Sequence, residues 1–200
     1  MIPGFEYPNE PHVRRHGPAG YSDYESYRDW LRDEFLFGCV YCLHRERWYG
    51  RGGTFHIDHC VPVTSDGSGV CEYTNLLYAC ATCNESKNAI LGVPDPCQLA
   101  FGDCLRVRQD GHVVSLNKHG EKLKQALLLD SPKNVEHRSK WISILNALRS
   151  DSPNLYQEMM SFPDDLPDLR EKQPPSNTKP HGALGCFFAL REKAQLPLTY

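Results

Sequence analysis

Two Cys-x-x-Cys pairs constrain the fold of this chain more than any other feature. The first pair is Cys39 and Cys42, and the second is Cys80 and Cys83. Each pair forms a turn that directs two thiols to one point, and zinc prefers four tetrahedral ligands of this type. The sequence therefore predicts one closed, structural zinc site, whose apparent binding energy of ~10–16 kcal/mol is available to folding.

The other cysteines and the start of the chain favour a reduced compartment. The chain has 200 residues and nine cysteines, and an odd number fits metal binding better than a set of disulfides. The first residues lack the basic and apolar regions of a signal peptide, and no run reaches the ~18 apolar residues of a membrane helix. We therefore expect a cytoplasmic protein with no membrane partner. The remaining cysteines are interpreted as small apolar core residues: Cys60, Cys71, Cys97, Cys104 and Cys186.

The charge of the chain restricts where a nucleic acid can bind. A net charge of −3 gives no general attraction to phosphate, so such a surface must be a local basic patch. The loop after the first cysteine pair combines arginines with aromatic rings, and this composition suits phosphate binding and base stacking. Arg45, Arg47 and Arg51 are therefore candidate nucleic-acid contacts. The same loop is also compatible with a hairpin whose rings cover the zinc site.

An Asp-His pair, Asp58 and His59, ends an apolar, strand-like run between the two cysteine pairs. A closed four-sulfur zinc site does not need these residues, but hydrolysis of a phosphodiester needs residues of these types. A histidine with an ordinary pKa near ~6.5 takes a proton from water at neutral pH, and a carboxylate binds a hard divalent cation. Because neighbouring strand residues point to opposite faces, the pair must reach a substrate from a distorted strand end.

The segment from Phe55 to Lys87, together with the upstream cysteine pair, resembles the HNH endonucleases of the zinc-stapled ββα-metal type. The resemblance spans roughly residues 37–91. It implies an α+β fold in which a ββα-metal core is wrapped by N- and C-terminal helices. It also implies a DNA-cleaving enzyme, an endonuclease or nickase that uses Mg²⁺ or Mn²⁺ besides the structural zinc.

The same resemblance assigns roles to single residues. His59 is expected to be the general base, and Asp58 and Asn84 are expected to hold the divalent ion. Asn84 occupies a position that is more often described as histidine. Asn75 matches the middle asparagine of the motif, which braces the loop and orients the histidine.

Two further polar residues lie close to this set. Lys87 falls three residues after Asn84, on the same face of the expected helix, and is a candidate phosphate contact. His56 shares a strand face with Asp58. It is either a partner of the metal ligands or a solvent-facing strand residue.

Capping and periodicity signals divide the rest of the chain. Ser22 and Glu25 form a capping box for a helix whose aromatic stripe we assign to the core. A β-hairpin, helices and a Pro-rich segment follow the core. The expected regions are an extended arm at 1–20, a nuclease domain at 21–130 with its core at 37–91, a helical extension at 131–163, and a Pro-rich linker with a C-terminal segment at 164–200.

Two other functions remain open at this point. A non-catalytic zinc module that binds nucleic acid would keep the cysteines without needing His59 and Asn84. A nuclease subunit of a larger defence or mobile-element complex would have the same chemistry, with specificity supplied by a protein partner. The acidic balance of the chain and the lack of a recognisable helix-turn-helix favour an enzyme that is weakly specific or depends on a partner.

Overall fold

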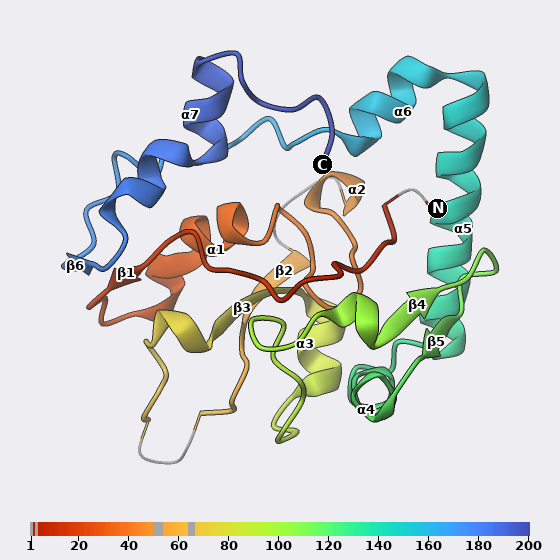
Figure 1. Cartoon of the computed structure of the whole chain (residues 1–200), viewed down its shortest axis with the longest axis horizontal. Coiled ribbons are helices and arrows are strands. Elements are labelled where there is room, and N and C mark those ends of the chain that lie inside the picture. Colours follow the sequence, from red (N-terminus) through yellow and green to blue (C-terminus); the bar gives the residue numbers. More distant parts are fainter. Residues whose placement is uncertain (1, 3, 50–53, 64–66) are drawn as a thin grey trace.

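The computed structural model describes residues 2, 4–49, 54–63 and 67–200, and shows a mixed α+β protein built from helices and three two-stranded sheets (Figure 1). The sheets pair β1 with β6, β2 with β3, and β4 with β5, all antiparallel. The elements are β1 Pro18–Ala19, η1 Tyr24–Tyr27, α1 Arg28–Glu34, α2 Glu46–Tyr49, β2 Phe55–His59, η3 Tyr73–Asn75, β3 Leu76–Cys80, α3 Ala81–Lys87, η4 Phe101–Asp103, β4 Leu105–Val107, β5 Val113–Ser115, α4 Lys118–Ala126, α5 Pro132–Asp151, α6 Pro153–Met160, β6 Ser176–Asn177, η5 Pro180–Gly185 and α7 Phe187–Glu192.

The centre of the molecule is the β2–β3 hairpin with α3 packed against it, which is a ββα unit (Figure 1). All five residues of β3 are buried, whereas the burial of β2 is interrupted at His56 and His59. The expected strand and short helix are therefore present. The helix ends at Asn88, whose φ of 43° stops the helical hydrogen-bond pattern, and asparagine tolerates that region better than most residues.

The helix before the core begins slightly later than the capping box predicts. Asp23, rather than Ser22, accepts the hydrogen bond from the backbone N–H of Glu25, and a 3₁₀ turn precedes α1. The predicted aromatic stripe does lie in the core, because Tyr27 and Trp30 are fully or almost fully buried. This stripe packs against the ββα unit and fixes the position of β3.

The region after the core follows the predicted order. The β4–β5 hairpin joins α4, whose first turn is capped by the side chain of Asn117. The long helix α5 begins with a proline at its first turn, as expected, and runs along one edge of the molecule (Figure 1). Buried Arg138 on α5 donates to the backbone carbonyls of Gly111 and Leu129, which ties this helix to the hairpin and to the end of α4.

The two ends of the chain lie together on the body of the protein. The N-terminal segment runs across the ββα unit, and Arg14 donates to the carbonyl of Leu76 at 2.6 Å (Figure 1). The C-terminal segment pairs with it through β1 and β6, and the backbone N–H of Phe187 donates to buried Asp33. No helix in the described ranges is long and apolar enough to cross a membrane.

Candidate metal and nuclease site

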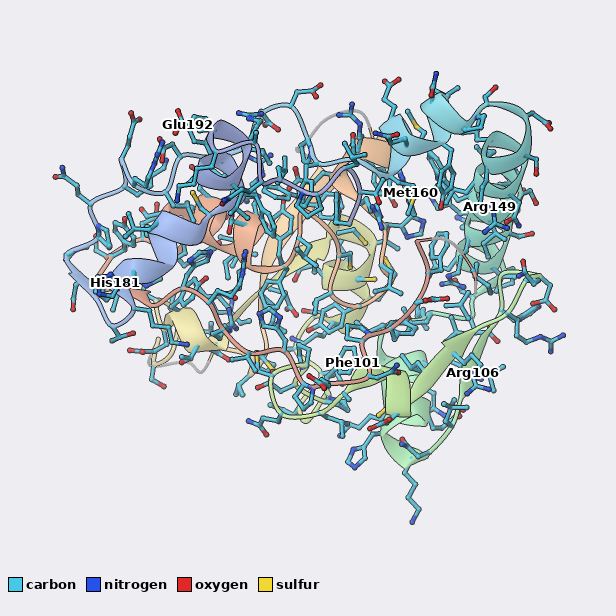
Figure 2. The ribbon with its side chains drawn as sticks, turned by 45° about the horizontal axis from the view of Figure 1, so that its top comes forward. Phe101, Arg106, Arg149, Met160, His181 and Glu192 are labelled. Carbon is cyan, nitrogen blue, oxygen red and sulfur yellow. The ribbon has the colours of Figure 1, made fainter. Side chains whose placement is uncertain are left out.

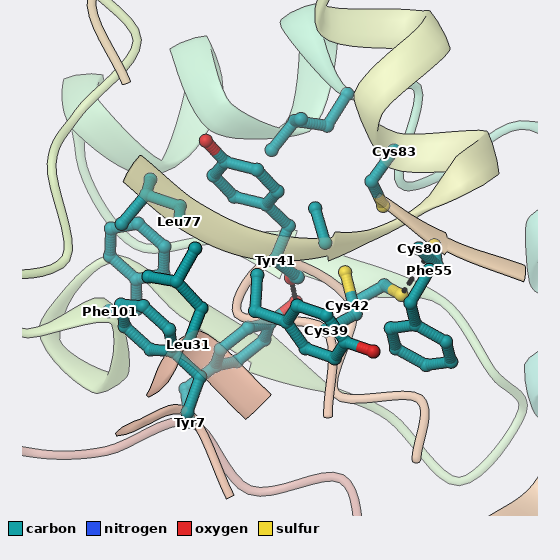
Figure 3. Close-up of a cluster of buried hydrophobic side chains, with 14 of the residues drawn as sticks. Tyr7, Leu31, Cys39, Tyr41, Cys42, Phe55, Leu77, Cys80, Cys83 and Phe101 are labelled. Atoms are coloured by element: carbon teal, nitrogen blue, oxygen red, sulfur yellow. Dashed lines mark hydrogen bonds between the residues drawn. The ribbon is translucent and has the colours of Figure 1, made fainter. Parts of the chain in front are cut away.

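The four cysteines converge as the sequence predicts. Cys39 and Cys42 lie on the turn between α1 and α2, Cys80 ends β3, and Cys83 lies in the first turn of α3 (Figure 3). All four are buried, and their sulfur atoms lie within 4.8 Å of one another, with 3.6 Å between those of Cys42 and Cys80. Four sulfurs at Zn–S distances of 2.3 Å are about 3.8 Å apart in a tetrahedron, so this arrangement fits a closed metal site.

The four thiols influence one another's ionisation. The hydrogen bond from Cys39 lowers the pKa of Cys80, whereas hydrogen bonding with Cys39 raises the pKa values of Cys42 and Cys83 well above their usual range. Four buried thiols cannot all ionise side by side without a positive charge between them. The cluster is therefore a ligand set that needs a metal for full ionisation, as structural zinc sites do.

Asp58 lies at the end of β2 with its side chain buried against α3. Its Oδ1 accepts a hydrogen bond from the Lys87 ammonium at 2.9 Å, and its Oδ2 accepts one from the Tyr41 hydroxyl at 2.5 Å. Burial raises the pKa of the Asp58 carboxyl, and both Lys87 and Tyr41 oppose that rise. The carboxylate thus has two hydrogen-bond donors inside the protein, and they come from different elements.

His59 faces away from α3, as strand alternation requires. Its ring makes an edge contact with Tyr24, with 5.2 Å between ring centroids, and its Nε2 lies 2.9 Å from the carbonyl oxygen of Val70. A carbonyl only accepts, so this hydrogen bond puts the proton of the neutral ring on Nε2. The lone pair is then on Nδ1, and the imidazole has a defined orientation.

Asn75 braces the loop after β2. Its side-chain oxygen accepts from the backbone N–H of Val61 at 2.8 Å, and its amide donates to the carbonyl oxygens of Val61 at 2.9 Å and Gly69 at 3.3 Å. The backbone N–H of Cys60 also donates to the carbonyl of Asn75. These bonds tie Cys60 and Val61, which follow His59, to Asn75 and to Gly69, the residue before His59's partner Val70.

Asn84 and His56 meet across the other face of β2. The amide nitrogen of Asn84 lies 3.4 Å from His56 Nδ1, while Lys87, one turn further along α3, contacts Asp58. The helix therefore places Asn84 opposite His56 and Lys87 opposite Asp58. His56 is half-exposed, and its ring nitrogen faces the Asn84 amide.

Lys87 differs from its expected position. Its side chain is fully buried and its ammonium donates to Asp58 and, at 2.6 Å, to the carbonyl oxygen of His59. In this structure the ammonium is therefore not presented to a phosphate. It holds the two adjacent residues Asp58 and His59 to α3, because one cation bonds the side chain of the first and the backbone of the second.

The arginines of the loop also differ from the predicted phosphate-binding surface. Arg45 is buried and donates to the carbonyl oxygens of Met160 and Tyr200, and Arg47 donates to that of Glu158 at 2.7 Å. Both guanidinium groups thus fasten the C-terminal part of the chain to α2. Arg51, the third candidate, lies outside the described residues.

Tyr41 and His44 belong to the site although the sequence analysis did not single them out. Tyr41 lies between the cysteines of the first pair and reaches Asp58, and His44 places Nδ1 3.2 Å from the sulfur of Cys42. Burial lowers the pKa of His44 to about 3, so its ring is a neutral hydrogen-bond partner of the cluster. A buried tyrosine hydroxyl needs a polar partner, but the sequence does not reveal which residue provides it.

The hairpin, the helix packed on it, the four-cysteine cluster and the strand-end Asp-His pair define a ββα-metal type of protein. Residues 39–89 match the family model described as HNH endonuclease, so this chain contains an HNH endonuclease domain. A search of curated protein sequences finds no match. The domain implies a nuclease, a hydrolase that acts on nucleic acid.

Proposed function

We propose that this protein is a metal-dependent endonuclease or nickase that hydrolyses DNA phosphodiester bonds, with His59 as the general base. The observation that carries the proposal is that the family match covers Asp58, His59, Asn75 and Asn84, of which the first three lie at the loop end of the β2–β3 hairpin and the fourth lies on α3 beside His56. A zinc module that only binds nucleic acid would not need an imidazole with its Nδ1 lone pair defined by Val70.

Within this proposal His59 accepts the proton of the attacking water on Nδ1. The Val70 carbonyl keeps the tautomer fixed, and the edge contact with Tyr24 keeps the ring in place. Asn75 supports the base indirectly, because it holds the loop that contains Val70. Since Asp58 and His59 face opposite sides of β2, the substrate phosphate must lie beyond the strand end to be within reach of both.

The catalytic divalent ion would be held by Asp58 and Asn84. A carboxylate has about four acceptor positions, and Asp58 uses two of them. The described part of the chain contains four buried carboxylates, and Asp58 accepts fewer hydrogen bonds than Asp33, Glu34 or Glu46. A carboxylate and an amide oxygen suit Mg²⁺ or Mn²⁺, which would stabilise charge on the phosphate and on the leaving oxygen.

The surface that contacts the DNA backbone is a second part of the proposal. Residues 105–140, here called the basic lobe, contain eight Lys and Arg against four Asp and Glu, whereas acidic residues predominate in the rest of the chain. Arg106 lies on the exposed side of β4 (Figure 2), and Lys118 and Lys122 are exposed on α4. The ammonium of Lys122 lies beside Gly92, in the loop that follows α3, so the basic lobe adjoins the helix that bears Asn84.

Cleavage assays on supercoiled DNA test the catalytic roles. His59→Ala should reduce cleavage by ~10²–10⁴-fold, the usual effect of losing a general base, while zinc content and DNA binding stay as in the wild type. Asn84→Ala should lose activity through weaker metal binding, so excess Mn²⁺ should restore part of it. His181→Ala, which changes an exposed histidine outside the domain, is the matched control. Undiminished cleavage by His59→Ala would refute the assignment of the base.

DNA binding by the His59→Ala protein tests the basic lobe separately from cleavage. The double change Lys118→Gln and Lys122→Gln should flatten the salt dependence of binding by a slope of about 0.9 per lost phosphate contact on duplex DNA. Lys172→Gln with Lys193→Gln, two exposed lysines of the C-terminal segment, is the control. Equal salt slopes in the two double variants would place the DNA elsewhere.

A further inference from the structure

Tyr41 connects the four-cysteine cluster to the proposed catalytic carboxylate. It is one of the two residues between Cys39 and Cys42, so a metal bound by this pair fixes the backbone on both sides of it. Its hydroxyl leaves the turn and donates to Asp58 Oδ2 at 2.5 Å. This distance lies at the short end of the range for a hydroxyl bound to an ionised carboxylate.

The ring of Tyr41 is held on all sides and has little freedom of its own. The side chain is 1 % exposed and stacks on Phe101 at 20° between the ring planes (Figure 3). The Tyr7 hydroxyl donates to the Tyr41 carbonyl at 2.8 Å, and the preceding N–H, of Val40, donates to the carbonyl of Tyr78 on β3. The hydroxyl therefore has a position that is set by the metal turn and the core together.

Asp58 depends on such fixed donors for its orientation. The terminal torsion of an aspartate has broad energy wells, so the rotamer alone does not fix the plane of the carboxylate. Here Lys87 on α3 holds one oxygen and Tyr41 holds the other. With both donors present, the acceptor positions that remain on the two oxygens have defined directions.

We propose that Tyr41 is a positioning residue of the nuclease centre, through which the zinc-binding turn sets the orientation of Asp58 for the divalent ion. The inference rests on the proposed function. Tyr41 does not touch substrate or water in this role. It acts by keeping the carboxylate in one plane together with Lys87. Groups that hydrogen-bond metal ligands commonly contribute about 10- to 100-fold to metal affinity or activity.

The protein contains a matched control for this role. Tyr78 is also fully buried, and its hydroxyl donates to the buried carboxylate of Glu46 at 2.6 Å. Glu46 is paired with Arg32 and lies outside the strand-end site. Tyr78→Phe therefore removes the same chemical group from the same kind of hydrogen bond, without altering Asp58.

The test measures Mn²⁺ binding to the zinc-loaded, full-length protein by electron paramagnetic resonance, in the His59→Ala background and without DNA. Tyr41→Phe should weaken Mn²⁺ binding by about 10- to 100-fold, with one zinc per chain retained, and Tyr78→Phe should leave it unchanged. In the proteins that keep His59, Tyr41→Phe should raise the Mn²⁺ concentration for half-maximal cleavage by the same factor, while the DNA dissociation constant stays constant. A merely structural tyrosine would lower the melting temperature without this change.

The outcomes separate this inference from the proposed function. If the wild type binds Mn²⁺ and cleaves DNA, but Tyr41→Phe binds Mn²⁺ as tightly as Tyr78→Phe does, only the role of Tyr41 is refuted. If the wild type neither binds Mn²⁺ nor cleaves DNA, both proposals fail.

A second measurement covers the case in which Tyr41→Phe does not fold. Fluorotyrosine placed at position 41 keeps the ring and the hydroxyl. Its fluorine resonance should move when Mg²⁺ is added to the wild type but not when it is added to Asp58→Asn. A resonance that ignores Mg²⁺ in the wild type, or moves equally in Asp58→Asn, would overturn the inference.

Discussion

Asp58 and Glu46 are two carboxylates in the interior of this protein that have similar neighbours. Each accepts a short hydrogen bond from a buried tyrosine and each pairs with one cation. The Asp58 cluster consists of Asp58, Tyr41 and Lys87, and the Glu46 cluster consists of Glu46, Tyr78 and Arg32. Both clusters join helices to the β2–β3 hairpin, so their structural parts are nearly the same.

The difference lies in how the cation binds. Arg32 is bidentate, with Nε donating to Oε1 at 2.9 Å and Nη2 to Oε2 at 2.8 Å, so Glu46 accepts three hydrogen bonds in all. The ammonium of Lys87 donates only once to Asp58 and gives a second hydrogen bond to the carbonyl of His59. A planar guanidinium occupies both oxygens of a carboxylate, whereas a compact ammonium leaves room on them. Asp58 is thus a buried acid that keeps unused acceptor positions, whereas Glu46 is a buried acid with a structural role only.

Loss of a zinc ligand should destabilise the protein more than any other change, and it should affect both clusters. Cys80→Ser removes one of four zinc ligands, and structural zinc provides ~10–16 kcal/mol of apparent binding energy. We expect this variant to lose zinc and to unfold at much lower temperature. Metal analysis and thermal unfolding would check this, with Cys186→Ser, a buried cysteine outside the cluster, as the control. A folded, active protein that contains no zinc would contradict the assignment.

Replacing Lys87 or Arg32 should destabilise the fold to a similar degree, but the two changes should affect cleavage differently. Lys87→Met and Arg32→Met each leave a buried carboxylate without its charge partner, which typically destabilises by about 3–5 kcal/mol. Urea unfolding would measure this loss in both. Lys87→Met should also abolish most cleavage under conditions where it remains folded, because both Asp58 and the His59 backbone lose a donor. Folded Arg32→Met should cleave DNA normally. Equal activities of the two variants would remove the distinction between the clusters.

Glu34 extends the comparison to a fully hydrogen-bonded carboxylate. Burial raises its pKa, but hydrogen bonds from His12 and from the backbone N–H groups of Arg15 and His16 lower it to about 2. A pKa below that of the unfolded chain means a contribution of about 3 kcal/mol, present above about pH 4.5 and lost as pH falls toward the folded pKa. We therefore expect Glu34→Gln to be less stable than the wild type at neutral pH.

Unfolding of both proteins at a series of pH values would check this expectation. The stability difference should shrink as the pH falls below about 4.5. Acid also releases zinc, but the loss is common to both proteins and cancels in the difference at each pH. A difference that does not vary with pH would show that Glu34 is not ionised in the folded protein.

The parts of the site that lie close together in sequence were predictable. The two cysteine pairs, the Asp-His pair and the loop-bracing Asn75 each follow from local spacing or from the family pattern, and the structure brings the cysteines and the hairpin together as expected. The β-hairpin after the core and the helix with Pro132 at its start were also evident from turn and capping residues. Local chemistry determines these features, so the sequence displays them.

The parts that could not be predicted depend on long-range contacts. Arg45 and Arg47 have the composition of a phosphate-binding loop, but carbonyl groups more than a hundred residues further along the chain occupy them. Nothing in the loop itself indicates that α6 and the C-terminal segment cover it. The Tyr41–Asp58 contact is of the same kind, because a hydroxyl's partner is decided by the packing of two separate elements.

The position of Tyr41 inside a metal-binding turn limits how this domain can be re-engineered. Any Cys-x-x-Cys turn would restore zinc binding, so a graft from an unrelated zinc protein would appear successful by metal content and melting temperature. Without a tyrosine as the second spacer residue, however, the graft would lack the hydroxyl that meets Asp58. A design that treats the turn as an exchangeable module should therefore keep the spacer and vary only what lies outside the two cysteines.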